Sequence, residues 1–165
     1  MRVAVGVVVR VIITALIIHT WLIAGLIVPL RVTGESMQPS LVPDQRMLVA
    51  RATYGLRAPA RGEVVVLYSP DQPLIQCVKR IAGLPGERLQ IRGRELLIDG
   101  VPRPWHYPLA AFPGVDDAAS RHYQLGPDEY FVLGDNSAVS DDSRTWTHAG
   151  IPFSMIVGKV LQVRK

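Results

Sequence analysis

The sequence predicts a mainly β domain that follows a single N-terminal transmembrane helix. The first observation behind this prediction is a run of apolar residues at 11–30 that contains no Asp, Glu, Lys or Arg. The second is the rest of the 165-residue chain, where Gly and Pro separate short runs rich in Val, Ile, Leu and Tyr. We therefore expect a short N-terminus at 1–10, an anchor at 11–30 and one domain at 31–165.

The anchor prediction follows from the length of the apolar run. Twenty helical residues span about 30 Å, the thickness of a bilayer core. A cleavable signal peptide is the alternative, but its apolar region is normally shorter, and no Ala-x-Ala site follows here. Arg2 and Arg10 precede the run and no acidic residue occurs before Glu35, which favours a cytoplasmic N-terminus and an extracytoplasmic domain. His19 lies in mid-span, where we expect a paired or snorkelling imidazole.

Short apolar runs after the anchor are expected to form strands. Residues 63–68 are almost continuously apolar, as in a buried strand, and residues 87–92 alternate. Asp99-Gly100 is a favoured turn pair. The expected strands are 47–52, 63–68, 74–82, 87–92, 95–98, 130–133 and 156–163. Residues 101–127 contain five prolines and are expected to form an irregular surface excursion.

Composition argues against several classes of function. The net charge is +4, but the arginines are scattered and no nucleic-acid-binding signature is present, so we expect no nucleic-acid partner. Cys77 is the only cysteine, which leaves no intramolecular disulfide and no cysteine-based metal site. It is expected to be a small buried hydrophobe. The Asp-rich segment at 134–144 lacks the twelve-residue EF-hand spacing, and we expect neither a metal nor a cofactor.

Ser36 and Lys79 are the candidate catalytic residues. Ser36 lies in a Gly-x-Ser-Met-x-Pro segment rather than a Gly-x-Ser-x-Gly elbow, and a serine nucleophile needs a base. The chain uses Arg for fifteen of its eighteen basic residues, yet Lys occurs at 79 in an apolar strand. A buried Lys can lose its proton, whereas Arg cannot. Arg80 should point to the opposite face of that strand.

A Ser-His-Asp triad remains open from the residues alone, because triads are recognised by geometry and not by order. The candidate histidines are His106, His122 and His148, and the candidate acids include Asp135, Asp141 and Asp142.

Three segments, 34–41, 76–86 and 134–144, together resemble the signatures of the type I signal peptidases, in that family's order. These are membrane-anchored Ser/Lys proteases that remove signal peptides from exported proteins. The resemblance implies that Ser36 is the nucleophile, Lys79 the base and Ser140 the residue that orients the base amine. It also implies two structural ion pairs, Arg80 with Asp135 and Asp142 with Arg144.

The resemblance further implies how substrate is held. The Ser36 backbone N–H would be an oxyanion donor. Some members add a serine hydroxyl at the position of Gly34, so this chain would use backbone donors there. Four apolar residues match positions that line shallow pockets selective for Ala-x-Ala sequences: Val32, Met37, Leu41 and Val78. The chain departs from the family at Glu63, where Asp is usual, and we expect this to be tolerated.

The implied partners are preprotein signal peptides and the lipid bilayer, with the export translocon as an open candidate. Two alternatives compete. A self-cleaving regulator of the related Ser/Lys fold would carry an N-terminal DNA-binding domain, where this chain has an apolar run. A non-catalytic, membrane-anchored secretion partner would not need the intact Ser36 and Lys79 pair.

Overall fold

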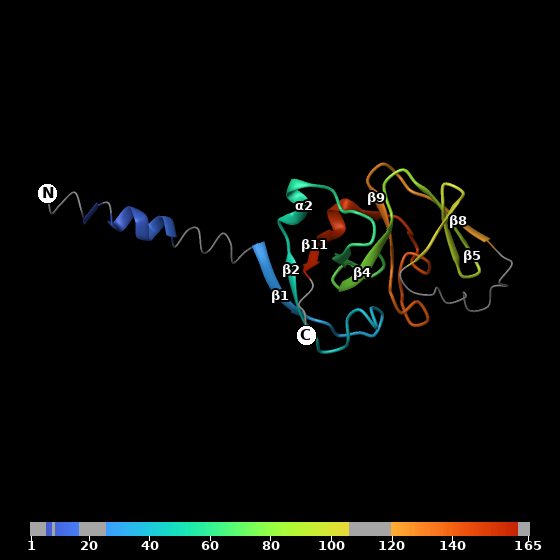
Figure 1. The fold of residues 1–165 in the computed structure, drawn as a ribbon, viewed down its shortest axis with the longest axis horizontal. Coiled ribbons are helices and arrows are strands. Elements are labelled where there is room, and N and C mark those ends of the chain that lie inside the picture. Colours follow the sequence, from blue (N-terminus) through green and yellow to red (C-terminus); the bar gives the residue numbers. More distant parts are fainter. Residues whose placement is uncertain (1–5, 8, 17–25, 106–119, 162–165) are drawn as a thin grey trace.

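Two antiparallel sheets form the domain that follows the N-terminal segment (Figure 1). The computed structural model describes residues 6–7, 9–16, 26–105 and 120–161. The larger sheet has the order β1-β2-β11-β3-β4-β9-β10, and the smaller has the order β7-β6-β5-β8. The mainly β fold predicted from the sequence is therefore confirmed. The strands are β1 Ile27–Arg31, β2 Arg46–Ala50, β3 Val64–Tyr68, β4 Gln76–Gly83, β5 Arg88–Arg92, β6 Glu95–Ile98, β7 Val101–Arg103, β8 Ser120–Gln124, β9 Glu129–Leu133, β10 Ile151–Pro152 and β11 Ile156–Leu161.

Strand β3 is apolar along its length because both of its faces are covered. Val65 and Leu67 pack on one side with Tyr130. Val66 packs on the other side with Met37. Since Met37 directly follows Ser36, this packing fixes the turn between β1 and β2 against the larger sheet.

The smaller sheet packs against the far ends of β4 and β9. Leu89 and Ile91 of β5 contact a buried cluster that includes Phe131 and Leu133 of β9. Gly83 ends β4 at a close approach: a Cβ there would lie 2.8 Å from Leu89 and 2.9 Å from Phe131. Glycine is therefore required where the two sheets meet.

The sequence prediction was wrong about one region and incomplete about another. Residues 101–127 are not irregular throughout, because they contain β7 and β8; residues 106–119 lie outside the described residues. Strand β8 was missed because its side chains are mostly polar and exposed on the smaller sheet, so it lacks an apolar pattern. The short helix α2, Thr53–Leu56, was also not predicted.

The N-terminal part differs from the predicted anchor at its C-terminal boundary. Residues 9–16 are helical, but residues 27–30 belong to β1, which pairs with β2. Their side chains alternate between exposed and half-buried, and an edge strand tolerates Pro29, which has no N–H. Within the described ranges, no helix is both long and apolar enough to cross a bilayer. Residues 17–25, with His19, lie outside those ranges.

Glu63, the residue immediately before β3, joins three neighbouring segments. Its carboxylate accepts hydrogen bonds from Tyr54 Oη (3.0 Å), Arg57 Nη2 (2.5 Å) and Lys159 Nζ (2.7 Å). These residues belong to α2, the loop after it and β11. Burial alone would raise the pKa of Glu63, but the hydrogen bonds from Arg57 and Lys159 lower the pKa from 4.5 to about 2. The longer Glu side chain thus serves as a link between elements.

We expect this link to make the stability of the domain depend on acid pH. A carboxyl whose pKa is lower in the folded state stabilises the fold above its unfolded pKa, and that contribution is lost as the pH falls from 4.5 to about 2. Glu63→Gln should lower the thermal midpoint at pH 7 by about 4–8 °C and flatten the loss of stability between those pH values. Glu95→Gln removes a carboxylate from an exposed ion pair with Arg92 and should change little. Equal thermal midpoints for Glu63→Gln and the wild type at pH 7 would contradict this role.

Candidate active site

Ser36 and Lys79, 43 positions apart in the sequence, are in direct contact. Lys79 Nζ donates a hydrogen bond of 2.9 Å to Ser36 Oγ. Ser36 lies on the turn between β1 and β2, and Lys79 lies in β4, which is flanked by β3 and β9. The fold therefore brings together the two residues that the sequence singled out, a hydroxyl and an amine.

The surroundings of Lys79 favour its neutral form. The residue is only 3% exposed, and burial lowers the pKa of its amine. Cys77, Asp142 and Asp141 oppose this shift without cancelling it. Burial raises the pKa of the Cys77 thiol to about 11, so this thiol is protonated near neutral pH and is a poor nucleophile. The amine of Lys79 is the group suited to accept a proton.

Arg80, the next residue in β4, makes four hydrogen bonds away from Lys79. Its guanidinium donates to both oxygens of Asp135, at 2.8 and 2.6 Å, to the Gly62 carbonyl at 2.7 Å and to Ser40 Oγ at 3.1 Å. Ser40 in turn donates to Asp135 at 2.5 Å. Because Ser40 is on the turn that carries Ser36, these bonds connect that turn to the strand of Lys79.

Sequence reasoning did not single out Ser40. Its only signal was a hydroxyl four residues after Ser36 in a turn, and hydroxyl residues are common in turns. The hydrogen bond to Asp135 joins residues 95 positions apart. A local sequence pattern cannot predict a contact between residues so far apart in the chain.

The second ion pair shapes the loop that leaves β9. Arg144 binds Asp142 through Nε at 2.8 Å and Nη2 at 3.0 Å, and it also donates to the Ser137 carbonyl at 2.8 Å. Asp142 accepts a further bond from the Gly134 N–H at 2.9 Å. All of these residues are buried, and a buried pair requires this many hydrogen bonds to offset its desolvation. The loop is thereby fixed beside Ser36.

Ser140 is buried on this loop, but its predicted hydrogen bond to Lys79 is not formed. Ser140 Oγ has no hydrogen-bond partner among the residues that the structure describes. The residue instead lies against Gly134, where a Cβ would come within 2.2 Å of Ser140 Oγ and 2.6 Å of the Ser36 carbonyl oxygen. The Asn136 N–H donates to that same carbonyl at 2.9 Å. Gly134, which sequence reasoning passed over, is what allows the loop and the Ser36 turn to touch.

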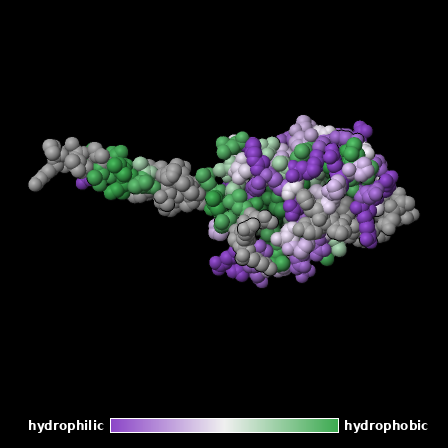
Figure 2. Space-filling model, viewed as in Figure 1, coloured by the Kyte–Doolittle hydropathy of each residue, from purple (hydrophilic) through white to green (hydrophobic). Residues whose placement is uncertain are grey.

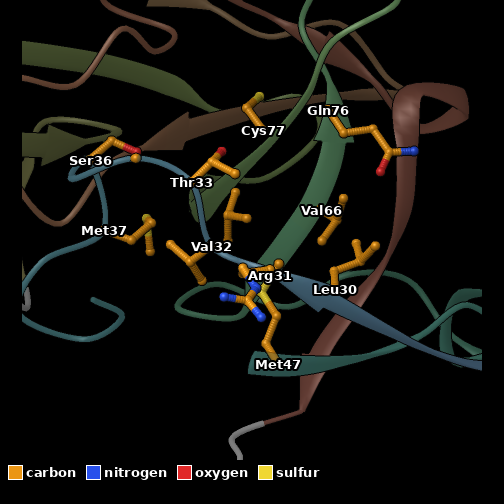
Figure 3. Close-up of a pocket in the computed structure, with 12 residues that line it drawn as sticks. Leu30, Arg31, Val32, Thr33, Ser36, Met37, Met47, Val66, Gln76 and Cys77 are labelled. Atoms are coloured by element: carbon orange, nitrogen blue, oxygen red, sulfur yellow. The ribbon is translucent and has the colours of Figure 1, made fainter. Parts of the chain in front are cut away.

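A pocket of about 300 Å³, here called the apolar pocket for its Leu, Val and Met side chains, opens beside Ser36 (Figure 3). Three polar residues, Arg31, Thr33 and Gln76, also line it. Its lining includes Val32, Met37 and Val78, which the resemblance implied as substrate-binding residues. Leu41 does not line it; this residue is buried in the core of the larger sheet and borders a different cavity, beside Arg80. Leu41 is therefore a packing residue in this structure. The sequence did not predict the other apolar lining residues, which are Leu30, Met47 and Val66.

A second pocket of about 430 Å³, here called the Lys79-side pocket, also opens at Ser36. Its lining includes Lys79 together with Glu35, Asp141 and Trp146. Gly34 lines both pockets, and a Cβ at Gly34 would have no heavy atom within 4 Å. The backbone of the turn that carries Ser36 is thus accessible from both pockets.

The structure does not bring the described histidines to Ser36. His122 lies on β8 of the smaller sheet and His148 is exposed, and neither lines the apolar pocket or the Lys79-side pocket. His106 lies outside the described residues. In the described part of the chain, Lys79 is the base candidate in contact with Ser36.

A hydroxyl nucleophile held against a buried amine between two pockets defines the class of a Ser/Lys hydrolase site. The family model described as signal peptidase, peptidase S26, matches residues 5–163, and the chain belongs to that family. It is 33% identical over 143 residues to signal peptidase I of Leptolyngbya laminosa, covering 79% of this chain and 64% of that protein. It is 35% identical over 142 residues to signal peptidase I of Bacillus amyloliquefaciens, covering 81% of this chain and 71% of that protein.

The fold is similar to a solved family structure as well. The crystal structure of a signal peptidase I from Enterococcus faecalis matches with a TM-score of 0.51 and 27% identity, over 62% of this chain and 97% of that one. The chain is shorter than several relatives: it spans 64% of the Leptolyngbya laminosa protein and 58% of a probable signal peptidase I-2 from Synechocystis.

We expect Gly134→Ala to loosen the contact between the loop and the Ser36 turn. The new methyl group would overlap Ser140 Oγ and the Ser36 carbonyl oxygen, and overpacking of this kind costs about 1–3 kcal/mol. Thermal unfolding should show the loss. Gly55→Ala is the matched control, because nothing lies within 4 Å of its Cβ position in α2. Ser140→Gly in the Gly134→Ala background should restore part of the stability, and the absence of any loss in Gly134→Ala would contradict this close packing.

Proposed function

We propose that this chain is a membrane-bound serine endopeptidase that cleaves N-terminal signal peptides from exported preproteins through Ser36 and Lys79. The observation that carries the proposal is the 2.9 Å contact between Ser36 Oγ and the buried Lys79 amine, in a chain of the S26 family. The names of its relatives, signal peptidase I, supply the substrate class.

The proposed reaction begins with proton transfer from Ser36 to Lys79. The neutral amine takes the hydroxyl proton as Ser36 Oγ attacks the scissile carbonyl, and it then gives that proton to the departing amine. The Ser36 backbone N–H, beside Gly34, would donate to the oxyanion. Lys79 then takes a proton from a water molecule that attacks the acyl-serine carbonyl, and it returns this proton to Ser36 Oγ as the ester bond breaks. Ser140 Oγ makes no hydrogen bond to Lys79 in this structure, so the orienting role that the resemblance implied for Ser140 stays a prediction.

The apolar pocket fits the small residues expected before the cut. Its volume of about 300 Å³ is shared by several subsites of a bound peptide, and Val32, Met37 and Val78 project apolar groups into it. These apolar groups can accept small apolar side chains, while Arg31, Thr33 and Gln76 line the rest of the pocket. An Ala-x-Ala sequence before the scissile bond is therefore the proposed specificity.

The proposed location is the plasma or inner membrane, with a cytoplasmic N-terminus and an extracytoplasmic domain. Apolar residues are exposed on the N-terminal helical segment and on the adjoining face of the domain (Figure 2). They include Val9, Ile12, Leu16, Ile27 and Leu48. Exposed apolar surface of this extent is typical of contact with a bilayer, which supports a bilayer partner; the translocon is a further proposed partner.

The dyad is tested by Lys79→Arg on a purified preprotein substrate with an Ala-x-Ala site. Arginine keeps the charge but does not deprotonate, so cleavage should fall by at least about a thousandfold, close to the loss in Ser36→Ala. Since the base must be neutral, the wild-type rate should rise with pH through a pKa below the usual lysine value, as the direction of the Lys79 shift requires. Lys159→Arg, a lysine on β11 paired with Glu63, is the control that should keep its activity.

Three outcomes separate the candidate functions. Cleavage of the preprotein that depends on Ser36 and Lys79 supports the signal peptidase. Cleavage only of the chain itself would favour the self-cleaving regulator, and no cleavage by folded protein would favour the non-catalytic partner. Substantial activity in folded Lys79→Arg would exclude Lys79 as the base.

The proposed topology makes a separate prediction for intact cells. Protease added to spheroplasts should digest the domain and leave a short protected N-terminal fragment, because the positive charges at Arg2 and Arg10 hold the N-terminus inside. An antibody to an N-terminal tag would detect that fragment, and a cytoplasmic protein would control for lysis. A domain that resists protease until the cells are lysed would refute this orientation.

A further inference from the structure

Two pockets meet at Ser36. The apolar pocket and the Lys79-side pocket share Gly34, Ser36 and Cys77, and they extend from these residues along separate walls. A peptide that is cut by Ser36 has residues on both sides of the scissile bond, so it occupies both pockets.

The position of Lys79 settles the direction. Lys79 lines the second pocket and is not among the residues that line the apolar pocket. The base that removes the Ser36 proton must hand it to the departing amine, so that amine leaves on the side of Lys79. The residues that follow the scissile bond therefore enter the Lys79-side pocket, and the residues before it lie in the apolar pocket.

The charged side chains around the two pockets have opposite signs. Arg31 lines the apolar pocket, whereas Glu35 and Asp141 line the Lys79-side pocket. In the described part of the chain, neither of these two carboxylates has a cationic side chain within salt-bridge distance. The amine of Lys79 faces the same pocket but is held toward its neutral form. The Lys79-side pocket therefore presents net negative charge.

Asp141 is also fixed in position. Its Oδ1 accepts a hydrogen bond from Thr145 Oγ1 at 2.5 Å, and its Oδ2 accepts one from Trp146 Nε1 at 3.0 Å. Ile75 and Val139 line the same pocket and have exposed apolar side chains. A Lys or Arg side chain can lay its apolar stem on such a wall and place its charged head near a carboxylate.

We propose that the Lys79-side pocket binds the first residues after the scissile bond, and that Glu35 and Asp141 make it prefer basic over acidic side chains there. This inference rests on the proposed function and adds a specificity on the leaving side of the cut. Charge pairs at exposed positions contribute little individually, so two carboxylates should give about a fivefold to tenfold preference.

The test uses the full-length protein and three peptide substrates that are identical up to the cut. They carry Lys, Gln or Asp at the first two positions after it. We expect kcat/KM to fall in the order Lys, Gln, Asp, with the Lys-to-Asp ratio near tenfold. Asp141→Asn and Glu35→Gln should each lower that ratio, the double variant should bring it close to one, and about 0.5 M salt should reduce it in the wild type.

The ratio is the readout because it separates charge recognition from other effects. A variant that only disturbs the loop or the pKa of Lys79 would change kcat/KM by the same factor for all three substrates, so the ratio would stay the same. Asp44→Asn removes the same charge from the exposed partner of Arg31 and should leave the ratio unchanged. Wild-type cleavage of all three peptides at equal kcat/KM, or a ratio that persists in the double variant, would overturn the inference alone; cleavage of none of them would overturn the proposed function with it.

Discussion

The guanidinium of Arg80 is the interaction on which the site depends. It joins Asp135 on the loop after β9, Ser40 on the nucleophile's turn and the Gly62 carbonyl before β3. These segments are far apart in the sequence, and within the described residues the guanidinium is the one group that binds all three of them. Because Arg80 is adjacent to Lys79 in a strand, the alternation of side chains places the structural cation on one face and the amine on the other. The register of β4 therefore determines the positions of both side chains.

This arrangement resolves a conflict between burial and polarity. Lys79 must be buried for its amine to be neutral, yet the loops around it are rich in Asp and Ser. Unpaired buried carboxylates near Lys79 would raise the pKa of its amine and favour the charged form. Pairing each carboxylate with a nearer cation weakens this effect. Asp135 is paired with Arg80, and Asp142 is paired with Arg144. The bidentate geometry of arginine with a carboxylate suits both pairs, and desolvation is then the dominant influence on Lys79.

The sequence predicted what is encoded locally. The apolar run of β3 and the alternation of β5 gave those strands, and the residue types in three short segments gave Ser36 and Lys79. It missed β8, whose polar side chains become a strand only by pairing with β5. Leu41 was wrongly predicted to line the substrate pocket. An apolar residue near Ser36 can belong either to a pocket wall or to the core, and the packing of the turn places Leu41 in the core.

Contacts across loops were the least accessible from sequence. The close approach of Gly134 to Ser140 and Ser36 is a property of two loops that meet in space, and a glycine before Asp-Asn reads locally as an ordinary turn residue. The same holds for Asp141 and Glu35, whose placement on one pocket follows from that approach. The packing that fixes the turn of Ser36 therefore also brings two carboxylates to the side of Ser36 where, in the proposed reaction, the product amine departs. The proposed chemistry and the proposed leaving-side charge preference would then have a common structural origin.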